Sequence, residues 1–253
     1  MGGLNAADVS VAAIDAIEGN HAHPLGRLPQ AIHDATAVVL GSRAFVFGGG
    51  TGETGTDAIR SVDAGGAVAL AGRLPAPASD VSAARIGSTA YVVGGYTGTV
   101  ALRSIVAFRP GAPARVAANL PFPLRYAAVA AAAGKLVIAG GTSGVIPKRE
   151  LLDFDPATKR VRRIGSLPAP LTHAAAAALG GAVYVIGGRT TLAGGQTRAI
   201  LSVDPSTGAV RRAGQLPRGL SDAVAVTDGN RILVIGGRDA DGRPTDEVVA
   251  LER

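Results

Sequence analysis

The sequence predicts an all-β fold built from repeated four-stranded antiparallel units. Two markers recur along the chain with one period, which is the mark of a repeat protein. A glycine doublet closes a short apolar run at residues 48, 94, 140, 187 and 236, so successive doublets lie 46, 46, 47 and 49 residues apart. A Leu-Pro pair begins at residues 28, 74, 120, 167 and 216 and has the same four spacings. Two independent markers with one period indicate a structural repeat.

Each period contains four predicted strands, which we name A to D. Strand A follows Leu-Pro after a few polar residues and is rich in small apolar residues, as in 174–179. A glycine turn leads to strand B, because glycine readily adopts the positive φ that two-residue hairpins need. Strand B ends in the doublet, and a variable loop leads to strand C, as in 150–156. The Asp-Pro pairs at 155–156 and 204–205 begin turns to strand D, which returns to the next Leu-Pro.

Four-stranded antiparallel units with this period are typical of β-propeller blades. We expect one propeller domain over 1–253, with repeats at about 1–27 (partial), 28–73, 74–119, 120–166, 167–215 and 216–253 (lacking strand D). Gly2-Gly3 lies 46 residues before Gly48-Gly49, so the first repeat would keep only strands C and D, at 8–15 and 21–29. This phase favours six blades with an incomplete first blade. The alternative is a closed five-bladed ring in which the N-terminal strand D completes the last blade.

The chain resembles the kelch-repeat propellers over essentially its whole length. Kelch blades carry a Gly-Gly doublet after strand B and a Tyr-Asp-Pro-like start to the following turn. Here Tyr91 precedes Gly94-Gly95, Tyr184 precedes Gly187-Gly188, and residues 154–156 read Phe-Asp-Pro. The chain has no Trp, an aromatic residue that kelch blades often carry in strand D, so its motifs are degenerate. The resemblance implies a bacterial kelch-type propeller that binds its partners through its loops.

Composition excludes several classes of protein. Aromatic residues are 4% of the chain and apolar residues 47%, so we expect a core of Val, Ile, Leu and Ala. The absence of cysteine excludes disulfides and thiolate metal sites. It also excludes the Cys-Tyr radical cofactor implied by a resemblance to the kelch-like copper oxidases of the galactose oxidase kind.

Charge and hydropathy bear on partners and location. The net charge of +6 comes from arginines spread along the chain rather than clustered, so no nucleic-acid partner is expected. No apolar run reaches the roughly 18 residues of a membrane span. The N-terminus lacks the pattern of a secretory signal. We expect a periplasmic or extracellular protein if an upstream signal peptide is missing from this chain, and a cytoplasmic one otherwise.

The candidate site lies where the variable loops emerge. In an antiparallel blade the D-to-A and B-to-C loops share one side, here called the loop face, and the A-to-B and C-to-D turns share the other, the turn face. The turns are short and are interpreted as structural. Variable loops on a rigid scaffold are where binding residues usually lie.

Polar residues recur at fixed places on the predicted loop face. The fifth residue after each Leu-Pro proline is Asp, Tyr or His, and these five positions form one column of the repeat. The residue before each of them is polar. Tyrosine, threonine or arginine follows four of the doublets. A mixture of Arg, His, Asp and Tyr could hold an acidic small molecule, an acidic sugar or a peptide of a protein partner. The alternative is that these residues only solvate the face. The ligand-binding candidates are His33, Asp34, Asp80, Tyr96, Arg125, Tyr126, Arg149, His173, Arg189, Arg198, Asp222 and Arg238.

We predict a non-enzymatic binding scaffold without a metal or cofactor. His21 and His23 have the spacing of two metal ligands, but the sequence shows no third. The alternative function is a sugar-processing enzyme, because the chain also resembles the bacterial six-bladed kelch proteins that interconvert sialic acid anomers. That chemistry needs an arginine for the carboxylate and a group that exchanges a proton. Its candidates here are Arg149, Glu150, Arg189, Arg198 and Glu247.

Overall fold

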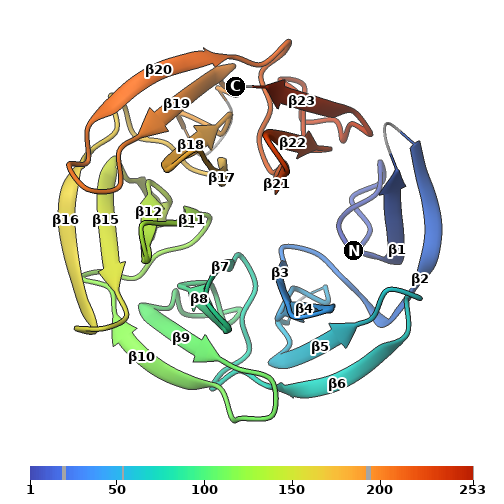
Figure 1. Ribbon diagram of the computed structural model, residues 1–253. Helices are drawn as coiled ribbons and strands as arrows, with labels where there is room; N and C mark the ends of the chain where they lie inside the picture. Colours follow the sequence, from blue (N-terminus) through green and yellow to red (C-terminus); the bar gives the residue numbers. More distant parts are fainter. Residues whose placement is uncertain (19–20, 53, 192–194, 253) are drawn as a thin grey trace. The chain divides into compact units, whose positions relative to one another are not determined.

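The regular structure of the chain consists of β-strands. The computed structural model describes residues 1–18, 21–52, 54–191 and 195–252. Every named element in these ranges is a strand, and all the strand pairs are antiparallel (Figure 1). Within the described ranges no helix is long and apolar enough to cross a membrane. The all-β prediction is confirmed.

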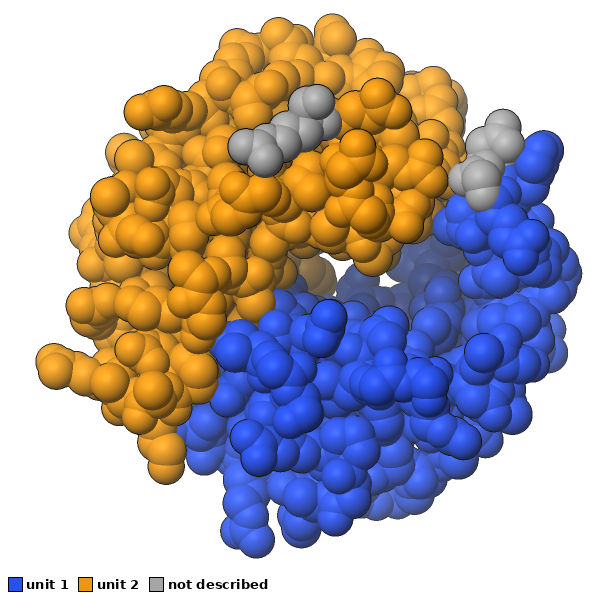
Figure 2. Space-filling model, viewed as in Figure 1, with its two compact units in different colours: residues 1–119 blue, residues 120–253 orange. Residues whose placement is uncertain are grey.

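The chain divides into two compact units, residues 1–119 and 120–253 (Figure 2). The boundary coincides with the predicted start of the repeat at Leu120. Unit 1 contains a two-stranded sheet, β1-β2, and two four-stranded sheets, β3-β4-β5-β6 and β10-β9-β8-β7. Its strands are β1 (Val11–Glu18), β2 (His21–Ile32), β3 (Thr36–Leu40), β4 (Arg43–Phe47), β5 (Ala58–Val62), β6 (Val68–Arg73), β7 (Ser82–Ile86), β8 (Thr89–Val93), β9 (Ser104–Phe108) and β10 (Arg115–Asn119).

Unit 2 contains two four-stranded sheets, β11-β12-β15-β16 and β17-β18-β19-β20, and a three-stranded sheet, β21-β22-β23. A short hairpin, β13-β14, lies in the loop between β12 and β15. The first strands of successive sheets contact each other in order, β11 with β17 and β17 with β21. The strands are β11 (Ala128–Ala132), β12 (Lys135–Ala139), β13 (Thr142–Ser143), β14 (Ile146–Pro147), β15 (Glu150–Asp155), β16 (Arg160–Ser166), β17 (Ala175–Leu179), β18 (Ala182–Ile186), β19 (Ala199–Val203), β20 (Val210–Gln215), β21 (Val224–Asp228), β22 (Arg231–Ile235) and β23 (Val248–Glu252).

The four complete sheets follow the predicted order A-B-C-D along the chain. The pair β1-β2 stands where strands C and D of the first repeat were expected, and β21-β23 where A, B and C of the last were expected; Arg253 lies outside the described residues. The first strand begins at Val11 rather than at residue 8. The Asn5 side chain accepts hydrogen bonds from the N–H groups of Ala7 at 2.9 Å and Val9 at 3.0 Å. Asp8 has a φ of 56°, so this segment turns before the strand begins.

The core is aliphatic in unit 2 and partly aromatic in unit 1. The buried residues of the two core clusters of unit 2 are all alanine, valine, leucine or isoleucine, as the composition predicts. In unit 1, however, the ring of Phe108 lies 5.4 Å from that of Phe45 and 5.5 Å from that of Phe47. Phe154 of unit 2 is also fully buried. The expectation of a purely aliphatic core is therefore wrong: the few phenylalanines supply the largest buried side chains.

The glycine doublets fasten neighbouring repeats together. The N–H of Gly49 donates to the carbonyl of Ala78 in the next repeat at 2.8 Å, and the N–H of Gly188 donates to Leu220 at 2.7 Å. A Cβ on Gly48, the first residue of its doublet, would lie 2.1 Å from the oxygen of Ala78. The doublet is thus required where strand B leaves its sheet and touches the next repeat, since no side chain fits there.

Gly2-Gly3 has the same conformation as the later doublets. Its φ angles are 67° and 111°, against 62° and 110° at Gly48-Gly49. The N–H of Gly3 donates to the carbonyl of Ile32 at 2.8 Å, as Gly49 does to Ala78. The sequence phase that placed Gly2-Gly3 at the end of a strand B therefore corresponds to a real structural equivalence.

Candidate functional site

Each D-to-A loop is tied to the B-to-C loop of its own repeat. Isolated antiparallel bridges join one residue of each loop, at His33–Gly50, Ser79–Tyr96, Arg125–Thr142, Thr172–Arg189 and Ser221–Arg238. Two backbone hydrogen bonds of 2.7–3.0 Å close each bridge. The two kinds of loop therefore emerge together, as the antiparallel order predicts, and their polar residues are held on one face of every repeat.

A column of left-handed residues follows these bridges. Asp34, Asp80, Tyr126, His173 and Asp222 have φ angles between 50° and 58°, a region that non-glycine residues seldom adopt. The N–H of each also reaches the preceding repeat where both lie in one unit: Asp80 donates to Asp34 at 2.9 Å, His173 to Tyr126 at 3.1 Å and Asp222 to His173 at 2.9 Å. Because the backbone fixes these positions, their side chains are free to differ. Such strained positions are concentrated at functional sites in proteins generally.

In unit 2 five of the candidate residues form one polar group, here called the loop-face cluster: Arg125, Tyr126, His173, Arg189 and Asp222. At its centre the ring of Tyr126 stacks on that of His173, with centroids 3.8 Å apart and planes inclined by 21°. The guanidinium carbon of Arg125 lies 5.0 Å from the centre of the Tyr126 ring, and its Nη2 donates to the Tyr126 hydroxyl at 3.2 Å. Arginine, tyrosine and histidine thus form a layered stack.

His173 has a polar neighbour at each ring nitrogen. Its Nδ1 lies 3.0 Å from the hydroxyl of Thr172, which in turn lies 2.7 Å from the hydroxyl of Thr142. Its Nε2 lies 3.9 Å from Oδ1 of Asp222. These neighbours favour one orientation of the ring. The side chain of His173 is 9% exposed, so its edge still reaches the surface. This is an arrangement that can accept or donate a proton.

Arg189 and Asp222 complete the cluster with an ion pair. The Arg189 Nη2 donates to Oδ2 of Asp222, and its Nε donates to the hydroxyl of Ser221 at 3.0 Å. The Ser221 hydroxyl donates in turn to Asp222 at 2.7 Å. The Arg189 and Asp222 side chains are 20% and 22% exposed, so solvent reaches both. Two guanidinium groups accompany one carboxylate here, which leaves the cluster with an excess of positive charge.

The other candidates lie elsewhere or serve the backbone. Arg198 donates to the carbonyl of Leu216, at the start of the next repeat, at 2.8 Å, and Arg238 donates to the carbonyl of Gly242 in its own loop at 2.7 Å. Arg149 is exposed, and its N–H donates to the Glu150 carboxylate at 3.0 Å. The candidates of unit 1 are His33, Asp34, Asp80 and Tyr96; the Nδ1 of His33 lies 2.8 Å from the Ser10 hydroxyl, and Asp80 is 5% exposed.

The residues proposed for sugar chemistry are only partly gathered. Arg189 belongs to the loop-face cluster, whereas Glu247 forms an ion pair with Arg218 at 2.5 Å. Arg149 and Glu150 are neighbours at the start of β15. His21 and His23 are exposed on β2, and within the described residues no three histidine, aspartate or glutamate side chains are arranged to hold a metal ion.

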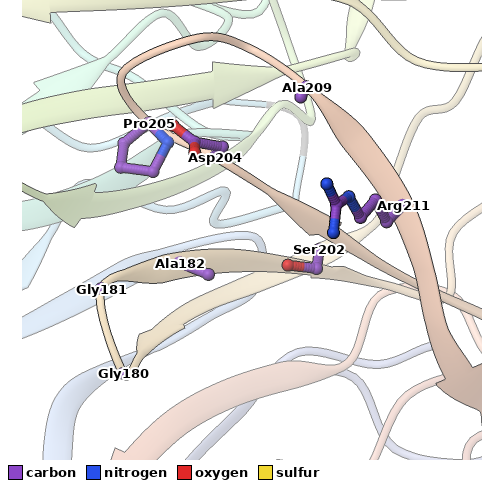
Figure 3. A pocket seen from close by; sticks show the side chains of 8 residues that line it. All are labelled: Gly180, Gly181, Ala182, Ser202, Asp204, Pro205, Ala209 and Arg211. Atoms are coloured by element: carbon purple, nitrogen blue, oxygen red, sulfur yellow. The ribbon is translucent and has the colours of Figure 1, made fainter.

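A hollow lies on the turn face, where the sequence suggested only structural turns. It has a volume of about 340 Å³ and is lined by the two turns of the repeat 167–215 and by Ser202 and Arg211 (Figure 3). Sequence reasoning missed it because short glycine and Asp-Pro turns carry no sign of a cavity. The sequence does show one difference between this repeat and the preceding one: Ser202 and Ala182 stand where the preceding repeat has Asp153 and Lys135.

Comparison with known proteins identifies the fold. No family model matches the chain, and no curated protein matches it by sequence. Among solved structures it is similar to one described as "Structure of YjhT", with a TM-score of 0.79 and 15% identity, over 92% of this chain and 85% of the other. At that identity the similarity concerns fold. The chain is a β-propeller with kelch-like repeats, as predicted.

Proposed function

We propose that this protein is a non-enzymatic kelch-type scaffold that recognises its ligand with the loop face. The observation that supports this proposal is the loop-face cluster, in which Arg125, Tyr126, His173, Arg189 and Asp222 converge from separate repeats of unit 2. Their backbone is fixed by bridges and inter-repeat hydrogen bonds. A rigid frame lowers the entropy lost on binding, which suits a recognition surface.

The chemistry of the cluster favours an acidic ligand. Arg125 and Arg189 supply guanidinium groups, which bind carboxylates through paired hydrogen bonds. The stacked rings of Tyr126 and His173 offer a flat surface beside them. An acidic peptide of a protein partner or an acidic small molecule or sugar would satisfy both features. The dispersed arginines of the chain provide no basic stripe, so we propose no nucleic-acid partner.

Thermal melting in the presence of acidic probes tests this proposal. The probes are sialic acid and a capped Asp-Glu peptide, with a neutral sugar and a capped Asn-Gln peptide as matched blanks. Binding to the folded state raises the melting temperature in a dose-dependent way. Arg125→Gln should lower the affinity obtained from the dose dependence about tenfold, the effect expected for one charged hydrogen-bonding partner. Arg160→Gln removes the same charge at the start of β16, on the turn face, and should leave the response unchanged.

The proposal fails if neither acidic probe shifts the melting temperature more than its blank. It also fails if Arg160→Gln weakens the response as much as Arg125→Gln does, because binding would then depend on net charge rather than on the cluster.

A second candidate function is sugar processing of the sialic acid mutarotase or epimerase kind. What favours it is His173, whose two ring nitrogens face Thr172 and Asp222 in a largely buried position. A histidine oriented in this way can act as a general acid or base. The test is exchange between the anomers of sialic acid, followed by NMR. His173→Gln should abolish an exchange that Glu150→Gln retains, and the absence of any exchange above the uncatalysed rate would leave only the scaffold.

A further inference from the structure

The hollow on the turn face lies within one blade, the sheet β17–β20. It opens between the A-to-B turn at Gly180-Gly181 and the C-to-D turn at Asp204-Pro205. Figure 3 shows Ser202, Asp204 and Arg211 around it. In the strand register Ser202 of β19 is paired with Tyr184 of β18 on one side and with Arg211 of β20 on the other.

The preceding blade has charged side chains at the same positions. In the sheet β11–β16, Asp153 of β15 is paired with Val137 of β12 and with Arg162 of β16. Asp153 therefore corresponds to Ser202, and Arg162 corresponds to Arg211. Lys135 lies two residues before Val137, as Ala182 lies two residues before Tyr184, so Lys135 corresponds to Ala182.

In the preceding blade a carboxylate occupies this place. The side chain of Asp153 is 1% exposed and accepts hydrogen bonds from Arg162 Nη2 at 2.8 Å and from Lys135 Nζ at 3.2 Å. The two cations reach the carboxylate from the strands on either side. This ion triad joins β12, β15 and β16 beside the turns of its blade.

The blade β17–β20 keeps the guanidinium and has lost the other two groups. Serine replaces the aspartate and alanine replaces the lysine, and the hollow of about 340 Å³ lies where they would be. We propose that this hollow binds the carboxylate of a ligand, which takes the place that the Asp153 side chain holds in the preceding blade. Arg211 pairs with the bound carboxylate and the Ser202 hydroxyl donates to it. This site is separate from the loop-face cluster and does not depend on it.

A fixed negative charge at the rim is compatible with this ligand. Hydrogen bonds from the N–H groups of Thr207 and Ser206, together with the charge of Arg211, lower the pKa of Asp204, so it is ionised at neutral pH. Asp155 corresponds to Asp204 in the preceding blade and accepts a hydrogen bond from the N–H of Ala157 at 2.9 Å. Its negative charge does not prevent the Asp153 carboxylate from pairing with Arg162 nearby. With one cation instead of two, we expect weak binding, with a dissociation constant of about 1 mM.

The first experiment is an NMR titration of the whole chain with sodium acetate, against sodium chloride at matched ionic strength. Saturable shifts of the Gly181 and Ser202 amides are expected. Arg211→Gln should weaken binding about tenfold, the effect of losing a charge-assisted hydrogen bond. Arg212→Gln is the matched control, because strand alternation places Arg212 on the opposite face of the sheet. Unsaturable shifts, or equal affinity in Arg211→Gln, would overturn the proposal.

Two further variants test the correspondence between the blades. Ala182→Lys restores the second cation and should strengthen acetate binding about fivefold. Ser202→Asp supplies a carboxylate from the chain itself and should abolish the acetate response. If Ser202→Asp retains the wild-type response, acetate does not occupy the place of the Asp153 carboxylate and the proposal is wrong.

A capped Gly-Glu-Gly peptide, with Gly-Gln-Gly as its blank, distinguishes the two sources of a carboxylate. Binding at least about tenfold tighter than acetate, dependent on Arg211, assigns the site to an acidic side chain of a protein partner. Affinity equal to that of acetate assigns it to a free small carboxylate. Both results uphold a carboxylate site, and neither changes with the outcome at the loop-face cluster.

Discussion

The residues that join one repeat to the next make their contacts through the backbone. At Gly48, Gly140 and Gly187 a β-carbon would collide with a carbonyl of the following repeat, and the N–H group of the next glycine donates to that same carbonyl. Four of the five column residues that face these junctions have charged or imidazole side chains in a left-handed conformation, which costs each of them on the order of 1 kcal/mol. The repeats are thus fastened by backbone groups, so the side chains of the loop face can differ from one repeat to the next.

Gly187→Ala tests the close approach at a doublet. The new β-carbon would lie 2.4 Å from the carbonyl oxygen of Leu220 and would hold a φ of 62°. The left-handed strain costs about 1 kcal/mol, and the loss of the Gly188–Leu220 hydrogen bond adds about another 1 kcal/mol before any clash. We expect the free energy of unfolding, measured with urea, to fall by about 3 kcal/mol or more.

Gly229→Ala is the matched control, because Gly229 has a φ of 59° and a β-carbon there would meet no atom within 4 Å. It should lose only the strain of about 1 kcal/mol. Equal losses in the two variants would show that conformation alone, and not the contact with the next repeat, requires glycine in the doublet.

At the scale of the element, the strands of a blade are joined by more than their ladders. In the sheet β11–β16 the carboxylate of Asp153 links β15 to Lys135 on β12 and to Arg162 on β16. The next sheet dispenses with this triad and has a hollow instead. Two blades with one backbone plan therefore differ in how their turn-side ends are stabilised.

Asp153→Asn should weaken the folded state by about 1–3 kcal/mol. Removing one partner of a fully buried ion pair costs about 3–5 kcal/mol. The loss is smaller here, because the side chains of Arg162 and Lys135 are 55% and 29% exposed and water can solvate them. Asp228→Asn, which breaks the exposed pair with Arg231, should cost less than about 1 kcal/mol in the same urea titration. Similar losses in both variants would mean that the triad behaves as a surface pair.

Amide exchange tests whether the loop-face junctions are as firm as the strands. The N–H groups of Asp222 and Gly188 donate to carbonyls of other repeats, so they should exchange slowly although neither residue lies in a named strand. The N–H groups of Ser206 and Thr207 donate to the exposed Asp204 side chain and should exchange much faster. Equal exchange in the two groups would show that the junctions open independently of the sheets.

The strands could be predicted from the sequence wherever a repeated pattern marks their ends. Glycine doublets, Leu-Pro pairs and short apolar runs placed strands A to D of the complete sheets. The hairpin β13-β14 was not predictable, since its four residues have no alternation long enough to read. The start of β1 was misplaced because a local turn around Asn5 competes with the strand. The buried phenylalanines were missed because composition counts residues without locating them.

On the scale of the whole molecule, periodicity predicted the propeller fold and the pairing of loops on one face. It could not predict which polar residues meet. Tyr126 and His173 occupy one column of the repeat, and their rings stack. Both residues have a left-handed backbone conformation, which no sequence motif predicts at these positions. The hollow beside Arg211 was equally invisible, because it results from two side chains that the neighbouring blade has and this one lacks.

The acid stability of the whole protein follows from its paired carboxylates. Burial alone would raise the pKa of Asp153, but the hydrogen bonds and charges of Arg162 and Lys135 outweigh it, and the pKa lies below its ordinary value of 3.8. The unfolded chain therefore binds the proton at higher pH than the folded chain does. The stabilisation is fully present well above the ordinary pKa and is lost as the pH falls through it toward the folded value. Urea midpoints measured from about pH 6 down to about pH 3 should therefore decrease, and Asp153→Asn should flatten this decrease. An unchanged slope in Asp153→Asn would assign acid sensitivity to other carboxylates of the chain.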